Sequence, residues 1–287
     1  MEIIYIGTAA SEGIPALFCK CPTCVEARKT MGREFRGRAG VCINKNLLID
    51  APPDIYHGCV AAGIDLSEIK DIVVTHAHED HFDAYELSTR RTPVYCFRPD
   101  EEKMRVWGNM RCGKLLDQYV PGSAKGHGDS TPGLCFTYSP MYEPVKTASG
   151  VTAYPLPADH DYEEECRIFL LEEDATGKRF LYGHDTGLFP DETMKFLKGK
   201  LCDVISLDCT YVYLKHDSGH MGLEGDVKMR KRLTEIGAAN DKTRFICHHF
   251  SHNGFVDNGA RKTQTEFISD AEKMGFIVAF DGMRIKI

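Results

Sequence analysis

Short apolar runs recur along the chain, and most of them lie next to Gly, Pro, Asp or Asn. Runs of this length, rich in β-branched residues and bounded by turn-forming residues, predict strands that are buried or half buried. We expect strands at Ile3–Ile6, Val41–Ile49, Asp71–Thr75, Val94–Phe97, Leu134–Tyr138, Gly150–Leu156, Arg167–Leu171, Arg179–Tyr182, Val204–Leu207, Arg244–Cys247 and Ile277–Phe280.

Helical patterning lies between these strands. The predicted helices are Pro53–Ala62, Asp100–Leu116, Asp191–Leu197, Glu224–Ile236 and Thr263–Met274. The strands are too many and too unevenly spaced for a simple strand–helix–strand series, so an α/β layered fold is favoured, with two sheets face to face and helices outside. No repeat or linker divides the chain. We therefore expect one domain over residues 1–287, with residues 83–150 as a candidate insertion near the site.

The composition is that of a globular protein, with 43% hydrophobic and 27% charged residues. No apolar run approaches the ~18–20 residues that a membrane span requires. The segment Met1–Gly7 passes directly into a predicted strand, without the basic-then-apolar order of a signal peptide. These features predict a cytoplasmic protein.

The cysteines and the net charge narrow the chemistry. Twelve cysteines in a long chain without an export signal favour reduced thiols and metal ligation over a disulfide framework. A net charge of −7 argues against broad nucleic-acid binding. It does not exclude a phosphate substrate, because bound divalent metals can reverse the local field of a site.

Four candidate metal ligands leave the end of one predicted strand within six residues. The apolar run Ile72–Thr75 leads directly into His76, His78, Asp80 and His81. Imidazoles two positions apart in a tight loop can reach one ion, and Asp80 and His81, past the turn, would face a neighbouring ion. Chance clustering of loop histidines and acids is the alternative. The position, density and order of the four residues favour a centre with two metals.

The segment His76–His81 resembles the HxHxDH signature of the metallo-β-lactamase superfamily. The resemblance implies an αββα sandwich, in which two mixed sheets lie face to face between outer helices, and two divalent ions. It also implies that Asp50, at the end of the run Leu47–Asp50, holds the second ring nitrogen of a metal-bound histidine. The alternative for Asp50 is a turn residue ahead of Pro52 and Pro53.

The superfamily pattern implies three further ligands downstream. His160 closes an apolar run and would be the third histidine of the first metal. Asp185 follows a predicted strand and matches the bridging carboxylate, whose two oxygens can span ions ~3.5–4 Å apart. His249 matches the last ligand, on the second metal. His184 and His248 are the rival residues in these last two loops.

Three thiols crowd a Pro-containing loop near the N-terminus, at Cys19, Cys21 and Cys24. The spacing is typical of a structural zinc site, which needs four soft or imidazole ligands in a closed tetrahedron. His252, three residues beyond His249, is the candidate for the fourth ligand. Three buried or unused cysteines are the alternative.

This cysteine spacing, the final His-x-Ser-His segment and the closing Val278–Met283 resemble the PhnP-like phosphodiesterases of the phosphonate pathway. The resemblance covers most of the chain except residues 83–150, where the pocket is expected to differ. It implies hydrolysis of a small phosphodiester, or of a ribosyl or nucleotide cyclic phosphate, by a hydroxide that bridges two Zn or Mn ions. One further zinc would be structural. PqqB, of the pyrroloquinoline-quinone pathway, shares the cysteines but departs from the ligand set, which is complete here.

Protonation of a departing alkoxide needs an acid. His220, in the Gly-flanked segment Ser218–Gly222, matches the place of a histidine in phosphodiesterase members of the superfamily. An ordinary histidine, with a pKa of about 6.5, suits general acid work. Asp80 would both ligate metal and orient the hydroxide. A helix-capping or surface histidine is the alternative for His220, and His216 is its nearest competitor.

The sequence leaves three other functions open: an RNase Z-like tRNA 3′-processing nuclease, a lactonase or thioesterase, and a non-catalytic PqqB-like carrier. The chain is acidic and lacks the Gly- and Lys-rich arm with which RNase Z grips tRNA. The complete set of seven ligands argues against a carrier, and an acid at His220 favours phosphate esters over acyl substrates. We therefore expect a small-molecule phosphate ester as substrate and no membrane or nucleic-acid partner. A homodimer is among the states that the sequence allows.

Overall fold

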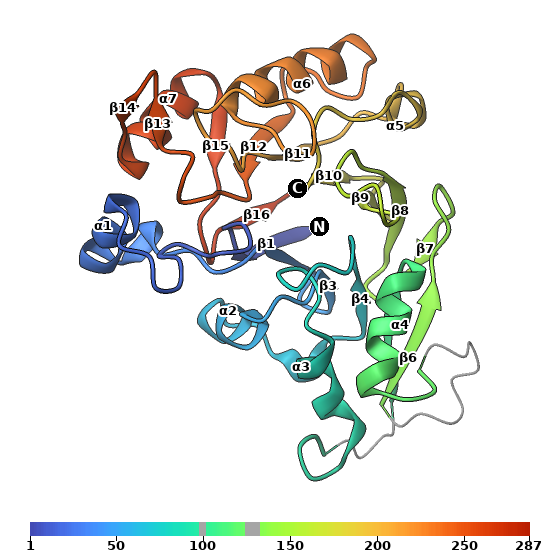
Figure 1. Ribbon diagram of the computed structural model, residues 1–287. Coiled ribbons are helices and arrows are strands. Elements are labelled where there is room, and N and C mark those ends of the chain that lie inside the picture. The colour runs from blue at the N-terminus through green and yellow to red at the C-terminus, as the bar shows by residue number, and fades with distance from the viewer. Residues whose placement is uncertain (98–101, 124–132) are drawn as a thin grey trace.

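The structure is a computed structural model that describes residues 1–97, 102–123 and 133–287 (Figure 1). Seven strands form the first sheet: β1 Glu2–Gly7, β2 Gly40–Ile43, β3 Leu47–Ile49, β4 Asp71–Val73, β5 Met104–Gly108, β6 Leu134–Tyr138 and β16 Arg284–Lys286. Their order is β16-β1-β2-β3-β4-β5-β6. The pairs from β16 to β3 are antiparallel and those from β3 to β6 are parallel, so the sheet is mixed.

The second sheet also has seven strands: β7 Val145–Lys146, β8 Val151–Pro157, β9 Arg167–Glu173, β10 Arg179–Gly183, β11 Val204–Asp208, β12 Arg244–His248 and β15 Phe276–Val278. Their order is β15-β12-β11-β10-β9-β8-β7. The pairs from β15 to β10 are parallel, and those from β10 to β7 are antiparallel. A small hairpin joins β13 Val256–Asp257 to β14 Ala260–Arg261.

The helices are α1 Pro22–Thr30, α2 Ile55–Ala61, α3 Ala84–Ser88, α4 Met110–Tyr119, α5 Asp191–Leu197, α6 Leu223–Glu235 and α7 Gln264–Lys273. Short 3₁₀ turns lie at Gly32–Glu34, Leu66–Glu68 and Thr89–Arg91. Side-chain caps explain several helix starts: Thr263 and Glu266 form a capping box at α7, and Asn109 accepts a hydrogen bond from the Cys112 amide at α4. In the described part of the chain, no helix is long and apolar enough to cross a membrane.

Successive side chains of each strand point to opposite faces of its sheet, and the buried apolar side chains form three clusters. Ile3 and Tyr5 of β1 pack against residues of the second sheet such as Phe169, while Ile4 and Ile6 point to the outer face. That outer face is covered by α2, α3 and α4, and the outer face of the second sheet is covered by α5, α6 and α7 (Figure 1). The layers are therefore helix, sheet, sheet, helix, which confirms the predicted αββα sandwich.

In one region a predicted strand is wrong, and a predicted helix is correct only over its last residues, Met110–Leu116, which belong to α4. Val94–Phe97 forms turns rather than a strand, and Val94 is 86% exposed. The strand lies instead at Met104–Gly108, inside the predicted helix Asp100–Leu116, whose first residues are outside the described ranges. Met104 and Val106 are buried and alternate with less buried neighbours, which is a strand period rather than a helical one.

Other boundaries differ more locally. The predicted strand Val41–Ile49 is a hairpin, because Asn44 and Lys45 take left-handed backbone conformations (φ 50° and 64°) and turn the chain between β2 and β3. Helix α1 begins immediately after Cys21, in a segment that the sequence analysis describes as a loop. Within residues 83–150, β5 and β6 extend the first sheet and α4 packs on them through Leu116. That this segment is an insertion stays a prediction.

Candidate metal centre

The candidate ligands follow the ends of strands at one edge of the two sheets. His76, His78, Asp80 and His81 come after β4, His160 after β8, Asp185 after β10 and His249 after β12. Asp50, Asp185 and His249 have positive φ angles of 65°, 49° and 62°. A left-handed conformation at a residue other than glycine costs about 1–3 kcal/mol and concentrates at functional sites. The backbone leaves each of these strands by a sharp turn that holds the side chain in the cluster.

Three histidines form the first half of the cluster. One ring nitrogen each of His76, His78 and His160 lies within 4.8 Å of the other two. His76 Nε2 is 2.9 Å and His160 Nε2 is 3.3 Å from His78 Nδ1. Three imidazole nitrogens that face a common point are a ligand set for a divalent transition metal.

The second half consists of Asp80, His81, Asp185 and His249, whose donor atoms also lie within 4.8 Å of one another. His81 Nε2 is 3.2 Å from Asp80 Oδ2, and the Oδ2 atom of Asp185 contacts the same nitrogen. That Asp185 oxygen is also 3.7 Å from His76 Nε2, in the first half. Asp185 therefore lies between the two groups, where the sequence places a bridging carboxylate.

The hydrogen bonds of this cluster test whether it fits metal ions. The Nε2 atoms of His81 and His249 are buried, and in the described part of the chain neither makes a hydrogen bond of normal geometry, although carboxylate oxygens lie beside both. Leaving a buried polar atom unsatisfied costs about 1–3 kcal/mol. A metal ion would satisfy both nitrogens, and imidazole with carboxylate is a donor set that several divalent ions accept. The residues present therefore fit a pair of divalent ions.

The electrostatics of the cluster agree with this fit. Burial lowers the pKa of His76 well below its ordinary value, and burial also lowers the pKa of His160. Neutral imidazole is the form that binds metal. Burial alone would raise the pKa of Asp185, but His249 and His81 hold it well below its usual range. The cluster thus surrounds an ionised carboxylate with imidazoles.

Asp50 lies directly behind the second group. Its Oδ2 atom is 2.8 Å from His81 Nδ1, and its Oδ1 atom accepts hydrogen bonds from the amide and hydroxyl of Thr75 at 2.8 and 2.9 Å. Asp50 is fully buried. This is the arrangement expected of a carboxylate that orients a metal-binding imidazole, not of a turn residue at the surface.

The rival histidines lie outside both groups. His184 Nε2 is 2.9 Å from the Ser206 hydroxyl, and His248 Nε2 is 2.9 Å from the Gly7 carbonyl oxygen. Burial lowers the pKa of both imidazoles well below the ordinary value. They form a buried pair beneath the candidate ligands.

His220 faces the cluster from the loop before α6, and its main partner is a residue that the sequence analysis missed. Its Nδ1 atom is 2.9 Å from Asp208 Oδ2. Burial lowers the pKa of His220, but Asp208 outweighs burial and raises it to about 9. Asp208 ends β11, just as Asp50 and Asp185 follow strands, and that shared position is the signal that could have found it.

Asp208 and His220 also lie close to Asp185 and His249, with one donor atom of each residue within 4.8 Å of the others. The oxygens of Asp208, however, already accept hydrogen bonds from the amides of Asp185, Thr210 and Met221, each at 3.0 Å. A carboxylate that is saturated in this way positions other groups rather than binding an ion. His216, the competitor of His220, is exposed and lies 3.4 Å from the His220 carbonyl oxygen through Nδ1.

A cavity of about 280 Å³ opens over the cluster. Its wall includes His78, Asp80, His160, Asp185, His220 and His249. The opposite side is formed by Ser11, Glu12, Tyr211, Ser251 and Asn253. No Lys or Arg of the described residues lines it, so bound cations would add to the positive charge that His220 can carry.

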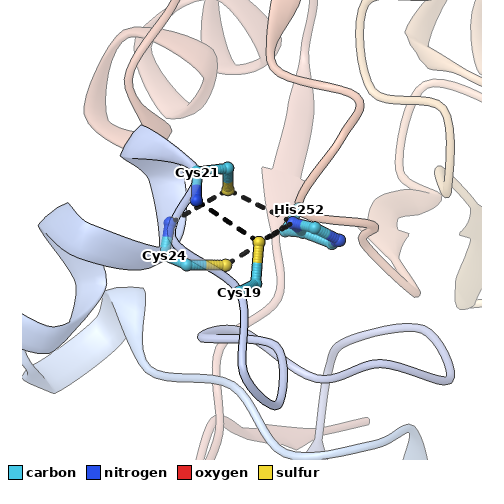
Figure 2. Close-up of side chains that lie close together, drawn as sticks. All are labelled: Cys19, Cys21, Cys24 and His252. Carbon is cyan, nitrogen blue, oxygen red and sulfur yellow. Dashed lines mark hydrogen bonds between the residues drawn. The ribbon is translucent and has the colours of Figure 1, made fainter.

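The thiols form a separate group with His252 (Figure 2). Cys19 and Cys21 precede α1, Cys24 lies in its first turn, and His252 comes from the loop after β12. His252 Nδ1 is 3.6, 3.3 and 3.5 Å from the sulfurs of Cys19, Cys21 and Cys24. A tetrahedral zinc with ordinary Zn–S and Zn–N bonds sets this separation at about 3.6 Å. The four residues therefore fit one structural zinc.

The comparisons with known proteins agree with this fold. The family model described as the beta-lactamase superfamily domain matches residues 45–250. The chain belongs to that superfamily. Its members are mostly metal-dependent hydrolases, and the clusters above contain side chains that could hold metal ions.

Individual relatives are distant but cover the whole chain. Coenzyme PQQ synthesis protein B of Acinetobacter baumannii is 22% identical over 327 aligned positions, which span 100% of both chains. The crystal structure of a diphosphatase from the PhnP family has a TM-score of 0.71 at 19% identity and covers 100% of this chain and 97% of its own. Zn²⁺-bound PqqB from Methylobacterium extorquens has a TM-score of 0.73 at 16% identity, with 100% of both chains covered. At these identities the structures share the fold.

We predict that His249→Ala removes about one equivalent of metal from the active centre, because the second group loses one of four donors. His248→Ala is the matched control: it truncates the adjacent buried histidine, which lies outside both groups. Metal per chain is measured by plasma mass spectrometry. Equal losses in the two variants, or loss in the control alone, would contradict the assignment.

We predict that Cys21→Ser removes one zinc and destabilises the protein. A zinc site between α1 and the loop of His252 ties distant segments together, so its loss should cost about 2 kcal/mol and lower Tm by about 4–8 °C. Zinc content and thermal unfolding check this, with Cys135→Ser, another partly exposed thiol, as control. Unchanged zinc and unchanged Tm in Cys21→Ser would show that the thiols are idle.

Proposed function

We propose that this protein is a phosphodiesterase that uses two divalent ions, Zn or Mn, to hydrolyse a small phosphodiester or a ribosyl or nucleotide cyclic phosphate. The observation that carries the proposal is the pair of Asp208 and His220, which presents a proton donor to the cavity beside the metal ligands. When bound, two divalent ions lower the pKa of a water molecule and neutralise charge on a phosphate group.

The side chains divide the remaining work. Asp80 lines the cavity and, as a carboxylate among imidazoles, would hold both metal and the attacking water in place. His220 pairs with Asp208 through Nδ1, which leaves Nε2 to donate a proton to the departing alkoxide. Asp208 acts through His220 and is a positioning residue. Four hydrogen-bond contacts hold it in one orientation.

The size and polarity of the cavity support a small substrate. A cavity of about 280 Å³ accommodates a small molecule, and its outer wall offers the hydroxyls of Ser11 and Ser251 and the amide of Asn253. With no Lys or Arg of the described residues in its wall, the cavity would bind phosphate mainly through the metals, with His220 beside them. A duplex or folded RNA would need a broad basic surface around the site.

A substrate screen tests the proposal as a whole. The metal-replete protein should turn over phosphodiesters and cyclic phosphates with kcat/KM at least ~10²-fold above lactones and thioesters, since differential transition-state binding sets such ratios. His249→Ala serves as the metal-deficient control. A preference for lactones or thioesters would replace the phosphodiesterase with an acyl hydrolase on the same metals, and no turnover of any class would favour a carrier.

We predict that His220→Ala lowers kcat on phosphodiesters with poor leaving groups by ~10²–10⁴-fold, the usual contribution of a general acid. The loss should shrink with bis(p-nitrophenyl) phosphate, whose nitrophenolate departs without a proton. Metal content should stay at the wild-type level. His216→Ala, four residues away and outside the cavity wall, is the control. Equal losses on good and poor leaving groups, or loss of metal, would refute the role of His220.

We predict that Asp208→Asn reproduces this pattern in a weaker form. The amide keeps the size of the carboxylate but removes the charge that raises the pKa of His220. The protonated form of His220 should then be lost at lower pH than in the wild type, and the alkaline limb of the kcat profile for poor leaving groups should move down in pH. A pH profile identical to that of the wild type would separate Asp208 from proton transfer.

A further inference from the structure

A second group of metal-binding side chains lies behind the active centre and outside the residues assigned to it. Cys209 follows β11, Cys247 lies within β12, and Asp226 lies in the first turn of α6. One donor atom of each lies within 4.8 Å of the other two. All three side chains are fully buried.

In the described part of the chain, the thiols of Cys209 and Cys247 are the polar side chains that lie beside the carboxylate of Asp226. Both of its oxygens are buried without a hydrogen bond. Aspartate is almost never fully buried unless it is paired. Burial raises the pKa of Asp226 well above its usual range. Among the described residues, the thiols of Cys209 and Cys247 are the metal-binding groups that lie next to Asp226.

We propose that Cys209, Asp226 and Cys247 bind a further thiophilic divalent cation of the Zn²⁺ class. Two sulfurs and one carboxylate supply three protein ligands, and the second oxygen of the carboxylate can complete the coordination of the ion. Thiolate ligands select zinc over Mg²⁺, Ca²⁺ or Mn²⁺. On binding, both thiols and the carboxyl group release their protons, and the cation offsets two of the three negative charges that remain.

This cation would be structural, because none of the three side chains lines the cavity. It would join β11, β12 and α6, the elements that carry the walls of the active centre. Cys209 stands between Asp208 and Thr210, both of which contact His220. Cys247 is two residues before His249 on the same strand end. The ion would therefore hold the acid pair and a metal ligand at a constant separation.

The test is the metal content of the full-length protein. Asp226→Asn keeps the shape of the side chain but removes the anionic ligand, so it should lose one equivalent of zinc relative to wild type. Cys21→Ser, which affects the separate thiol group of Figure 2, should lose a different equivalent, and the double variant should lose two. Activity is not the readout, so failure of the proposed phosphodiesterase activity leaves this result unaffected.

If Asp226 is a buried neutral acid that binds no cation, the opposite outcome is expected. The amide of Asp226→Asn would replace such an acid with little change, and unchanged zinc content in this variant overturns the proposal. Should Asp226→Asn fail to fold, cadmium-113 NMR of the cadmium-loaded wild type gives the answer. The proposal requires a resonance for two sulfurs and two oxygens, distinct from the three-sulfur, one-nitrogen site of Cys19, Cys21, Cys24 and His252. Absence of that resonance overturns it.

Discussion

The active centre depends on collecting buried histidines and carboxylates at one edge of two sheets, which is a costly arrangement. Burying an ionisable group without a partner costs several kcal/mol of folding free energy. Imidazole rings that face one another cannot all find hydrogen-bond partners among themselves. The αββα sandwich brings strand ends from both sheets together, so that carboxylates and imidazoles become one another's neighbours. Asp80 and Asp185 then lie between imidazole rings, and the unsatisfied nitrogens of His81 and His249 face toward the same space. Divalent cations are the partners that such a cluster fits.

The zinc-type site at the N-terminal cysteines connects to this centre through Glu12. One oxygen of Glu12 accepts hydrogen bonds from the Ser251 hydroxyl and, at 3.3 Å, from the His252 amide. The same oxygen is 3.6 Å from His252 Nε2, while Nδ1 of that ring faces the three thiols. Glu12 and Ser251 also line the cavity. The thiol site is therefore linked, through Glu12, to the wall of the cavity and to the loop that carries His249.

Much of this organisation is local in the sequence. An apolar run followed directly by His76–His81, the acids at the ends of runs such as Leu47–Asp50, and the spacing of three cysteines each occupy a few consecutive residues. Strands β8 to β12 also follow short apolar runs that periodicity detects. The two-sheet architecture and the ligands of the segment His76–His81 could be predicted for this reason, whereas His160, Asp185 and His249 were implied by the resemblance to the superfamily. Within each of these segments, the side chains that could bind metal are only a few residues apart in the sequence.

The sequence by itself thus determined the strand ends and the side chains that follow them. Only the tertiary structure decided which distant groups meet. Both Val94–Phe97 and Met104–Gly108 are apolar enough to form a strand, and the parallel pairing of the latter between β4 and β6 selects it. Asp208 reaches His220 across twelve residues, and Asp226 reaches two thiols on neighbouring strands. Such contacts depend on sheet order and on how α6 packs, and local periodicity does not encode either.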